Sequence, residues 1–544
     1  MRHRRLLWIL PALLLATVLL AQEAPYLKLT RVSEILTALL RTVITHYVEP
    51  IDADELFRAG VDSLLRRLDP YSYFIDEEGS DELDILSTGA YVGIGIAAAV
   101  RDSMLTVVEV HPNTQAWAAG IRVGDRIYKV DSAVVLHRSS RELRRYTRGE
   151  PGTPIVLWLL RQRLWGGYDT LRIQLQREEI RLRALPIVER LHDSIGYIRL
   201  ERFSRRAPEE LRQAIQQLLS QAPVRALVLD LRDNPGGLLD AAVNVCGLFL
   251  PPDIPIVTVR GRDPQQDRTY YAYTSPVSTE LPLVVLINGR SASASEIVAG
   301  VLQDLDRAVL VGEPSLGKGV VQTMFPMPYG TSLRLTTARY FMPSGRTIQK
   351  QPLPEFAHPT AAPPQYYRTR NGRPVVANSG ILPDTIVSGA DSLPLPVRWL
   401  QTEGWLGRFA TAYAASMPTL KSLPPSELLS QLERFLEVHG QRDRLYPLTH
   451  MLRTALQQAE DASVAATSVR QLERLLQQLQ REEPSLLRRY QTELLPILER
   501  ELLLRFLPRA EVLRRSLPRD PQLQAALELL ENYGYHKILA TSSK

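Results

Sequence analysis

Three serines alternate with alanine in the segment SASASE, residues 291–296, and an apolar run with helical spacing follows them. Ser293 and Glu296 have the spacing of a capping box, S-x-x-E, so helix capping alone accounts for both residues. A serine at a helix start is also well placed for nucleophilic attack, because the first amides and the helix dipole stabilise a developing oxyanion. The two interpretations remain open until a base for the serine is found.

A serine nucleophile needs a group that takes its proton, and histidine is the usual one. The chain has nine histidines, but none lies between His192 and His358. Lysine is the remaining candidate, and Lys318 is the one lysine between residues 179 and 349. Arginine stays charged, whereas burial moves the pKa of a lysine towards neutrality. Lys318 is therefore a candidate base, and a surface lysine without a chemical role is the alternative.

Buried strands are expected directly before each of these candidates. The apolar runs that predict parallel strands are RALVLDL (225–231), LPLVVLI (281–287) and AVLVG (308–312), with helical segments between them. Because the ends of neighbouring parallel strands face one crevice, Ser293 and Lys318 are expected to meet there. The turn DNPGG follows the first of these strands, and its Gly236 and Gly237 can bring backbone N–H groups close to a substrate carbonyl.

Two glycine-rich segments resemble nucleotide-binding motifs incompletely. GEPSLGKG (312–319) has Gly319 in place of the hydroxyl that holds magnesium, and the strand-like VVQTMF follows where a helix is needed. GIGIAA, from Gly93, fits a dinucleotide fingerprint in spacing, but β-like residues follow it. Such a loop can instead hold a peptide carboxylate on free backbone N–H groups, and a simple hairpin turn is the plain alternative. The chain has no H-E-x-x-H or Cys/His cluster, so neither a metal nor another cofactor is expected.

The composition is that of a globular protein with several domains. The chain has 544 residues, of which 45% are hydrophobic and 23% charged. A net charge of +6 gives no reason to expect a nucleic-acid partner. The single cysteine, Cys246, excludes a disulfide within the chain. No apolar run after the N-terminus approaches the roughly 18 residues of a membrane span, which excludes a polytopic membrane protein.

The N-terminus predicts export. The basic residues MRHRR precede an apolar run, LLWILPALLLATVLLA, that ends at Ala21, a small residue suited to cleavage. An uncleaved anchor is the alternative. The expected organisation is this signal or anchor at 1–21, a helical region at 25–88, a small β-rich domain at 89–178, an α/β region at 179–390 with an irregular loop at 351–385, and a helical C-terminal region at 391–544.

Together these residues resemble the carboxyl-terminal processing peptidases, also called tail-specific proteases. The resemblance runs from about residue 32 to 388. It rests on motifs in the family's order: LDPYSYF, YVGIGI, AGIRVGDRIYKV, LDLRDNPGG, NGRSASASEIVAGVLQD, VGEPSLGKGVVQT, LRLTTARYFMPSGRTIQ and GILPDT. One small departure is Ser315–Leu316, where the family usually has Thr–Phe.

The resemblance implies an exported serine endopeptidase with a Ser–Lys dyad and an acyl-enzyme intermediate. By motif position, Ser293 is the nucleophile, Lys318 the base and Gln322 the residue that orients the lysine, while Ala294 and one of Gly236 or Gly237 supply the oxyanion hole. Glu296 and Asp304 fall on motif positions too and are interpreted as structural support. The implied fold is a β/α protease core related in shape to crotonase and Clp peptidase, with an inserted PDZ-like domain.

The PDZ-like segment implies how a substrate is recognised. Its carboxylate loop comprises Tyr91, Val92, Gly93, Ile94, Gly95 and Ile96. The expected partners are proteins with exposed C-terminal tails, in the periplasm or cell envelope, with a membrane tether at the N-terminus as an alternative to a cleaved signal. The C-terminal helices are expected to bind an adaptor or a second copy of the chain. A catalytically inactive envelope scaffold is the alternative function.

Overall fold

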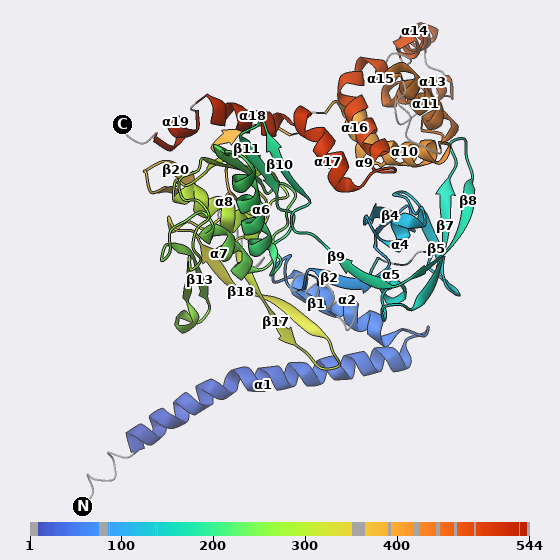
Figure 1. Ribbon diagram of the computed structural model, residues 1–544. Coiled ribbons are helices and arrows are strands. Elements are labelled where there is room, and N and C mark those ends of the chain that lie inside the picture. The colour runs from blue at the N-terminus through green and yellow to red at the C-terminus, as the bar shows by residue number, and fades with distance from the viewer. Residues whose placement is uncertain are drawn as a thin grey trace, which may run out of the picture. The chain divides into compact units, whose positions relative to one another are not determined.

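The computed structural model divides the chain into two compact units, which are described separately. Unit 1 comprises residues 1–74, 324–336 and 353–358, and unit 2 comprises the remainder (Figure 1). The backbone is described for residues 9–75, 85, 88–136, 138, 140–350, 365–389, 393–417, 424–441, 446–461, 465–482, 486–532 and 534–540.

Unit 1 contains the helices that the sequence predicts near the N-terminus. α1 spans Ile9–His46 and α2 spans Ala53–Arg66. Asp52 caps α2 by accepting the N–H of Asp54 at 2.8 Å. Among the described residues, no helix is both long and apolar enough to cross a membrane. The predicted export signal at 1–21 lies outside the residues whose side chains are described.

The centre of unit 2 is a six-stranded sheet that confirms the predicted α/β pattern. Its strands, in spatial order, are β10 (Ile187–Leu191), β11 (Ile195–Arg199), β12 (Ala226–Asp230), β15 (Leu283–Ile287), β16 (Val309–Gly312) and β21 (Thr385–Ile386). All neighbours pair in parallel except β10 and β11. The carboxyl ends of β12, β15 and β16 therefore meet at one edge, where the candidate residues follow.

Helices cover both faces of this sheet, because its central strands are apolar on both sides. The helices α6 (Ala207–Gln221), α7 (Leu239–Gly247) and α8 (Ala294–Asp304) pack on one face, with Leu227 and Leu229 of β12. The opposite face, with Val228, packs against α18 (Pro521–Glu531) and α19 (Gly534–Ala540) (Figure 1). The end of the C-terminal region thus completes the α/β core, which the expectation of a separate helical region at 391–544 did not foresee.

The β-rich domain is inserted between two strands that lie side by side. β2 (Ala90–Gly93) enters it, β9 (Glu178–Arg181) leaves it, and the two pair antiparallel. The sheet between them has the order β3 (Ile96–Arg101), β4 (Met104–Val110), β5 (Arg126–Val130), β7 (Pro154–Gln162) and β8 (Tyr168–Gln176), with β6 (Ala133–Val134) beside β5 and the helices α4 (Gln115–Ala118) and α5 (Ser140–Thr147). β3 is an edge strand of this sheet, so one side of its backbone is open to a further strand.

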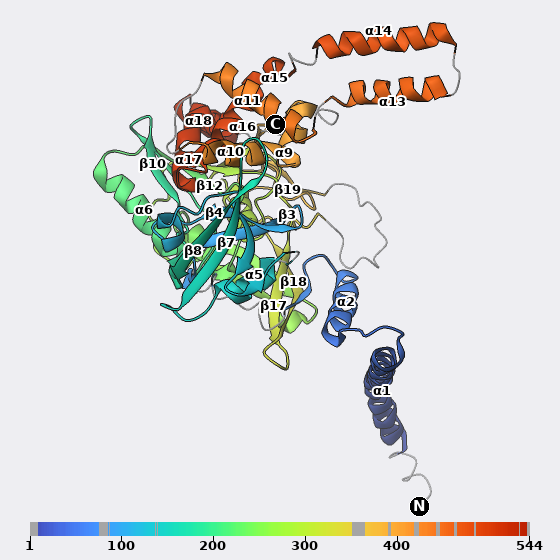
Figure 2. The same ribbon diagram turned by 90° about the vertical axis from the view of Figure 1, so that its right-hand side faces the viewer.

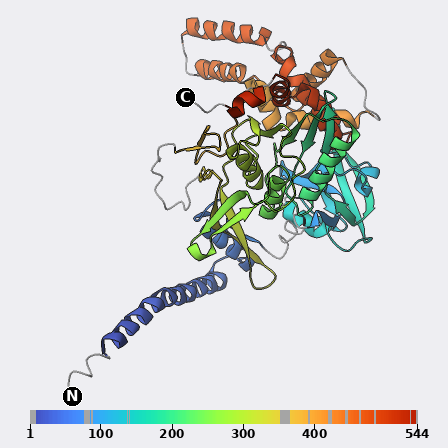
Figure 3. The ribbon, with the colours of Figure 1, turned by 60° about the vertical axis from the view of Figure 1, so that its left-hand side comes forward.

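A second, separate sheet includes four further strands. It contains β13 (Pro255–Gly261), β14 (Arg268–Tyr271), β17 (Val320–Pro326) and β18 (Ser332–Phe341). The expected irregular loop at 351–385 is partly wrong, because β19 (Tyr366–Arg368) and β20 (Pro374–Val376) form a hairpin within it (Figure 3). Residues 351–364 of that loop lie outside the described residues.

The predicted C-terminal helices are present, and one of them contacts the β-rich domain. They are α9 (Leu395–Thr402), α10 (Trp405–Ala415), α11 (Pro425–Val438), α13 (Pro447–Asp461), α14 (Ala466–Glu482), α15 (Leu486–Arg489), α16 (Gln491–Leu503) and α17 (Arg509–Ser516) (Figure 2). Arg122 donates to the carbonyl of Ala414 at 3.0 Å, and Thr411 donates to that of Val123 at 3.3 Å. Helix α10 therefore holds the loop between α4 and β5 of the β-rich domain.

Candidate active site

Ser293 stands at the start of α8 in a strained backbone conformation. Its φ is 55°, a value that non-glycine residues rarely adopt. Residues with such strained backbone angles cluster at functional sites. α8 itself is buried along its whole length. Ser293 is partly exposed, whereas Ser291 and Ser295 are fully buried. A rigid helix thus presents one of the three serines to solvent.

The outer serines hold two loops together. The Ser295 hydroxyl donates to the carbonyl of Asn234 at 2.9 Å, and the Ser291 hydroxyl donates to that of Leu231 at 2.8 Å. The N–H of Ala292 donates to the same Asn234 carbonyl at 3.1 Å. The loop after β12 is therefore tied to the loop before α8. This decides which serine is available for chemistry, a question that the alternation of serine and alanine leaves open.

Lys318 lies in the loop after β16, and its side chain is held from the next strand. Its Nζ donates to Oε1 of Gln322 in β17 at 2.9 Å, so the predicted lysine–glutamine pair is in contact. The carbonyl of Lys318 accepts from the hydroxyl of Tyr340, which is buried, in β18. The Tyr340 hydroxyl also lies 3.4 Å from the carbonyl of Ser293. One tyrosine therefore connects the backbones of both candidate residues.

Glu296 makes the most direct connection between the two loops. Its Oε2 accepts the backbone N–H of Ser293 at 2.8 Å and that of Lys318 at 2.9 Å. Its Oε1 accepts the Ser315 hydroxyl at 2.5 Å and the Gly317 N–H at 2.7 Å. Burial raises the pKa of Glu296, and these four donors act in the opposite direction by favouring the ionised form. The capping box thus extends beyond its own helix, which local spacing could not indicate.

The loop DNPGG approaches Ser293 closely, as expected for an oxyanion hole. A Cβ at Gly236 would lie 2.9 Å from the Ala294 nitrogen and from the Ser293 Cβ, so a glycine is required. The Gly236 N–H donates to the side chain of Asn234 at 2.9 Å. Within the described residues, no hydrogen bond takes up the N–H of Gly237 or of Ala294. Of the two glycines that the sequence offers, Gly237 therefore has the available donor.

The predicted carboxylate loop joins β2 to β3. Val92 and Gly93 belong to β2, Gly95 makes the turn with a φ of +78°, and Ile96 opens β3. In the described part of the chain, the N–H groups of Ile94 and Gly95 make no hydrogen bond. Arg148 lies over the ring of Tyr91, with Cζ 3.8 Å from its centroid. The open edge of β3 follows directly, which is the arrangement that β-strand addition needs.

The two nucleotide interpretations fail on structure. Strand β17, not a helix, follows GEPSLGKG. The N–H groups of Gly317 and Lys318, which a phosphate would need, bind the Glu296 carboxylate. Strand β3 likewise follows the loop at Gly93. Both glycine-rich segments shape loops next to strands.

A buried charge network behind the site is a feature that sequence reasoning missed. Asp230, at the end of β12, accepts from Tyr197 at 2.6 Å, Arg199 at 3.0 Å and Arg232 at 2.7 Å. Burial acts to raise the pKa of Asp230, but Arg232 and Arg199 outweigh it and hold that pKa well below its usual range. Arg232 also pairs with Asp520, the N-cap of α18. In the sequence, the acidic and basic residues of LDLRD (229–233) were the available signal of this network.

Three family models match parts of this chain. The family model for peptidase family S41 matches residues 194–355, that for a PDZ domain matches 106–161, and that described as "Probable PDZ-protease, C-terminal helical domain" matches 397–530. The carboxy-terminal-processing protease of Bartonella bacilliformis is 37% identical over 347 residues, which cover 61% of this chain and 78% of that protein. The carboxyl-terminal-processing protease of Picosynechococcus sp. is 35% identical over 304 residues, covering 55% and 71%.

A solved structure, that of the photosystem II D1 C-terminal processing protease, is 25% identical with a TM-score of 0.38, covering 65% of this chain and 87% of that one. The family matches, together with the fold and site, define a serine-type peptidase with an inserted PDZ domain and a C-terminal helical domain. The chain belongs to peptidase family S41, among the carboxyl-terminal processing proteases.

Proposed function

We propose that the chain is an exported endopeptidase that cleaves proteins near their C-termini with Ser293 as nucleophile and Lys318 as base. The observation that carries the proposal is that one carboxylate oxygen, Glu296 Oε2, holds the backbone N–H groups of both residues. The nucleophile and the base are thus fixed to a common atom, although 24 positions separate the residues in the sequence.

The reaction follows from these positions. The uncharged amine of Lys318 takes the proton of the Ser293 hydroxyl as Oγ attacks the substrate carbonyl. The N–H groups of Gly237 and Ala294 donate to the oxyanion that forms. The lysine then gives its proton to the leaving amine, which departs and leaves an ester on Ser293. Water activated by the same lysine hydrolyses that ester, and Gln322 orients the amine throughout.

The PDZ domain selects the substrate by its tail. The tail lies as an added strand on the open edge of β3, and its terminal carboxylate binds the backbone N–H groups of the Tyr91–Ile96 loop. Amidation of the tail removes the charge that this loop recognises. A peptide with an apolar tail is therefore expected to lose affinity when its terminal carboxylate is amidated.

The decisive experiment replaces the base without changing its charge. Lys318→Arg keeps a cation but removes the proton acceptor, so hydrolysis of an unfolded protein with an apolar C-terminus should fall to background. Lys129→Arg, in the PDZ strand β5, is the matched control and should retain activity. Ser293→Ala should be inactive as well. Activity in Lys318→Arg, or unchanged activity in Ser293→Ala, contradicts the proposal.

Export rests on the N-terminal sequence and needs its own test. The basic residues and apolar run at 1–21 support translocation out of the cytoplasm. Deletion of residues 1–21 should leave the protein in the cytoplasmic fraction, whereas the full chain should be found in the envelope fraction. The mass of the exported form distinguishes a cleaved signal from an anchor.

A further inference from the structure

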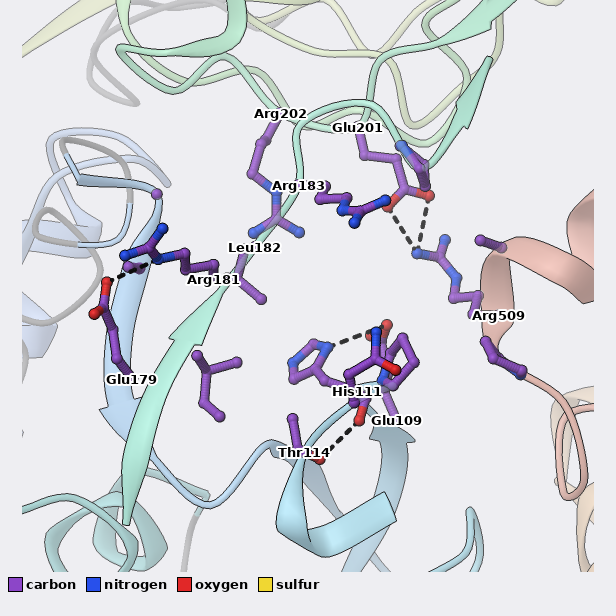
Figure 4. Close-up of a pocket in the computed structure, with 18 of the residues that line it drawn as sticks. Glu109, His111, Thr114, Glu179, Arg181, Leu182, Arg183, Glu201, Arg202 and Arg509 are labelled. Atoms are coloured by element: carbon purple, nitrogen blue, oxygen red, sulfur yellow. Dashed lines mark hydrogen bonds and ion pairs between the residues drawn. The ribbon is translucent and has the colours of Figure 1, made fainter. Parts of the chain in front are cut away.

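A cavity of about 780 Å³ lies in unit 2, away from Ser293 and Lys318, and neither catalytic residue lines it. Three parts of the chain contribute to its wall: the PDZ domain with Glu109 and His111, the segment around β9 with Arg183, and the segment after β11 with Arg202. Helix α17 closes one side with Arg509 (Figure 4). The catalytic proposal gives this cavity no role.

The carboxylates of the wall are already engaged within the protein. Glu201 pairs with Arg509 at 2.9 Å, Glu179 with Arg181 at 3.1 Å, and Glu109 lies 3.8 Å from His111. Glu178 accepts the N–H of Gln115 at 2.7 Å, and Glu210 accepts that of Ala184 at 3.1 Å. Glu201 and Glu179 thus pair with arginines, whereas Glu178 and Glu210 are held by backbone N–H groups.

Three arginines of the wall are not engaged in this way. Across the described residues, no hydrogen bond, ion pair or ring contact involves the guanidinium groups of Arg183, Arg202 or Arg206. The Nε of Arg202 is moreover buried and has no hydrogen-bond partner. A buried donor without an acceptor costs free energy, and a guanidinium group binds carboxylates through two parallel hydrogen bonds. The buried Nε of Arg202 therefore lacks an acceptor that a carboxylate would supply.

The position of Arg202 connects the cavity to both substrate sites. The next residue, Phe203, donates to the carbonyl of Gly236 at 3.1 Å, and its own carbonyl accepts from Leu238 at 2.8 Å, so Phe203 supports the oxyanion loop. On the PDZ side, burial raises the pKa of Tyr91 to about 12, and the charges of Arg148 and Arg202 act against this rise. Arg202 thus precedes the residue that supports the oxyanion loop, and its charge acts on Tyr91 of the carboxylate loop.

We propose that this cavity binds an acidic side chain of the substrate polypeptide, in the stretch between the tail held by the PDZ domain and the bond that is cleaved. Arg202 and Arg183 donate to the carboxylate, with Arg206 adding positive charge at the rim. Figure 4 shows Arg202 directed into the open space on whose far side His111 and Glu109 lie. The path of the substrate polypeptide past the cavity rests on the proposed function. The cavity and its arginines are defined without that proposal.

The test measures binding and hydrolysis separately. Fluorescent peptides with one apolar tail carry a single Glu, or Gln as the reference, at each successive position upstream of that tail. In the Ser293→Ala protein, Glu should bind roughly tenfold more tightly than Gln at one position or a few adjacent positions. The difference should shrink to about twofold in Arg183→Gln/Arg202→Gln and should weaken with added salt. With Ser293 present, the same Glu should lower KM and leave kcat nearly unchanged.

Arg205→Gln is the matched control, because Arg205 is a neighbouring exposed arginine that does not line the cavity. Arg202→Lys keeps the charge and should retain part of the preference, and thermal unfolding of each variant checks that it folds. The inference is overturned if no position distinguishes Glu from Gln, or if the double variant keeps the full preference. If the peptides with Glu bind more tightly but the wild-type chain hydrolyses none of them, the catalytic proposal alone is refuted. If the wild-type chain hydrolyses the peptides without preferring Glu, this inference alone is refuted.

Discussion

The Oε2 atom of Glu296 accepts the backbone N–H of Ser293 at 2.8 Å. The same carboxylate accepts three further donors from the loop of residues 315–318, so a single buried anion fixes the start of α8 against the loop that carries the proposed base. The helix cap therefore connects the two loops of the proposed catalytic site.

Glu296→Gln should lower kcat/KM by roughly a hundredfold while the chain remains folded. The substituted amide has one oxygen to accept bonds, and its NH₂ group faces backbone donors that it cannot satisfy. Steady-state hydrolysis and circular dichroism measured together check this. Wild-type rates in the variant would show that the carboxylate does not hold the site.

Acidification should abolish activity in two proton steps. The first is protonation of Lys318, which removes the proposed base. The second is protonation of Glu296, whose pKa burial raises, so this step occurs at a higher pH than for an ordinary glutamic acid. A raised carboxyl pKa in the folded state means that protonation of Glu296 itself favours folding, so activity should be lost before the protein unfolds.

The pH profile of kcat/KM measures both steps. Its logarithmic slope should steepen from one proton to two as the pH falls through the titration of Glu296. Circular dichroism over the same range should show native signal, because the carboxylates whose pKa is lowered, such as Asp230, lose their contribution to stability only at lower pH. A slope that stays at one down to acid unfolding would exclude the second step.

Ser295→Ala should affect stability more than chemistry, the reverse of Ser293→Ala. The buried hydroxyl of Ser295 donates to the carbonyl of Asn234, and its loss should cost about 1 kcal/mol. Denaturant midpoints and hydrolysis rates of the two variants provide the comparison. If Ser295→Ala were inactive and fully stable, the assignment of roles among the three serines would be wrong.

Gly236→Ala should abolish activity. Its Cβ would lie 2.8 Å from the carbonyl oxygen of Ala292 and 2.9 Å from the Ala294 nitrogen, and both are backbone atoms that cannot move aside. Gly166→Ala is a suitable comparison, since Gly166 also has a positive φ, +99°, but open space around it. Both variants carry backbone strain, so a difference in hydrolysis between them reports the contact at the site.

Truncation after Ser516 should prevent the protease core from folding. It removes α18 and α19, which cover one face of the central sheet, and Asp520, which pairs with Arg232. A chain that ends at residue 540 should behave as the full chain. The point variant Leu523→Ala should cost roughly 2–4 kcal/mol, because Leu523 is 1% exposed in that interface. A soluble, active chain ending at residue 516 would show that the helices are dispensable.

The sequence by itself determined the local parts of this protein. Residues within a few positions of one another determine helix caps and strand patterns. The helix after Ser293 and the strand after Lys318 could therefore be predicted from local spacing. The pairing of Lys318 with Gln322 could be predicted from the family's motifs. The alternation of strands and helices along the chain could also be predicted, because apolar runs separated by amphipathic helices are typical of a parallel sheet.

Tertiary structure decided everything that depends on partners far away in the sequence. Packing brings together loops that are distant in the sequence. It thereby buries Ser291 and Ser295 against the loop after β12, and it lets Glu296 bind both loops of the site. The N–H of Gly236 is occupied in the same region. The packing of α18 on the sheet and the buried Nε of Arg202 without an acceptor arise in the same way. Hydrogen-bond saturation and burial are properties of the assembled fold, and no local spacing encodes them.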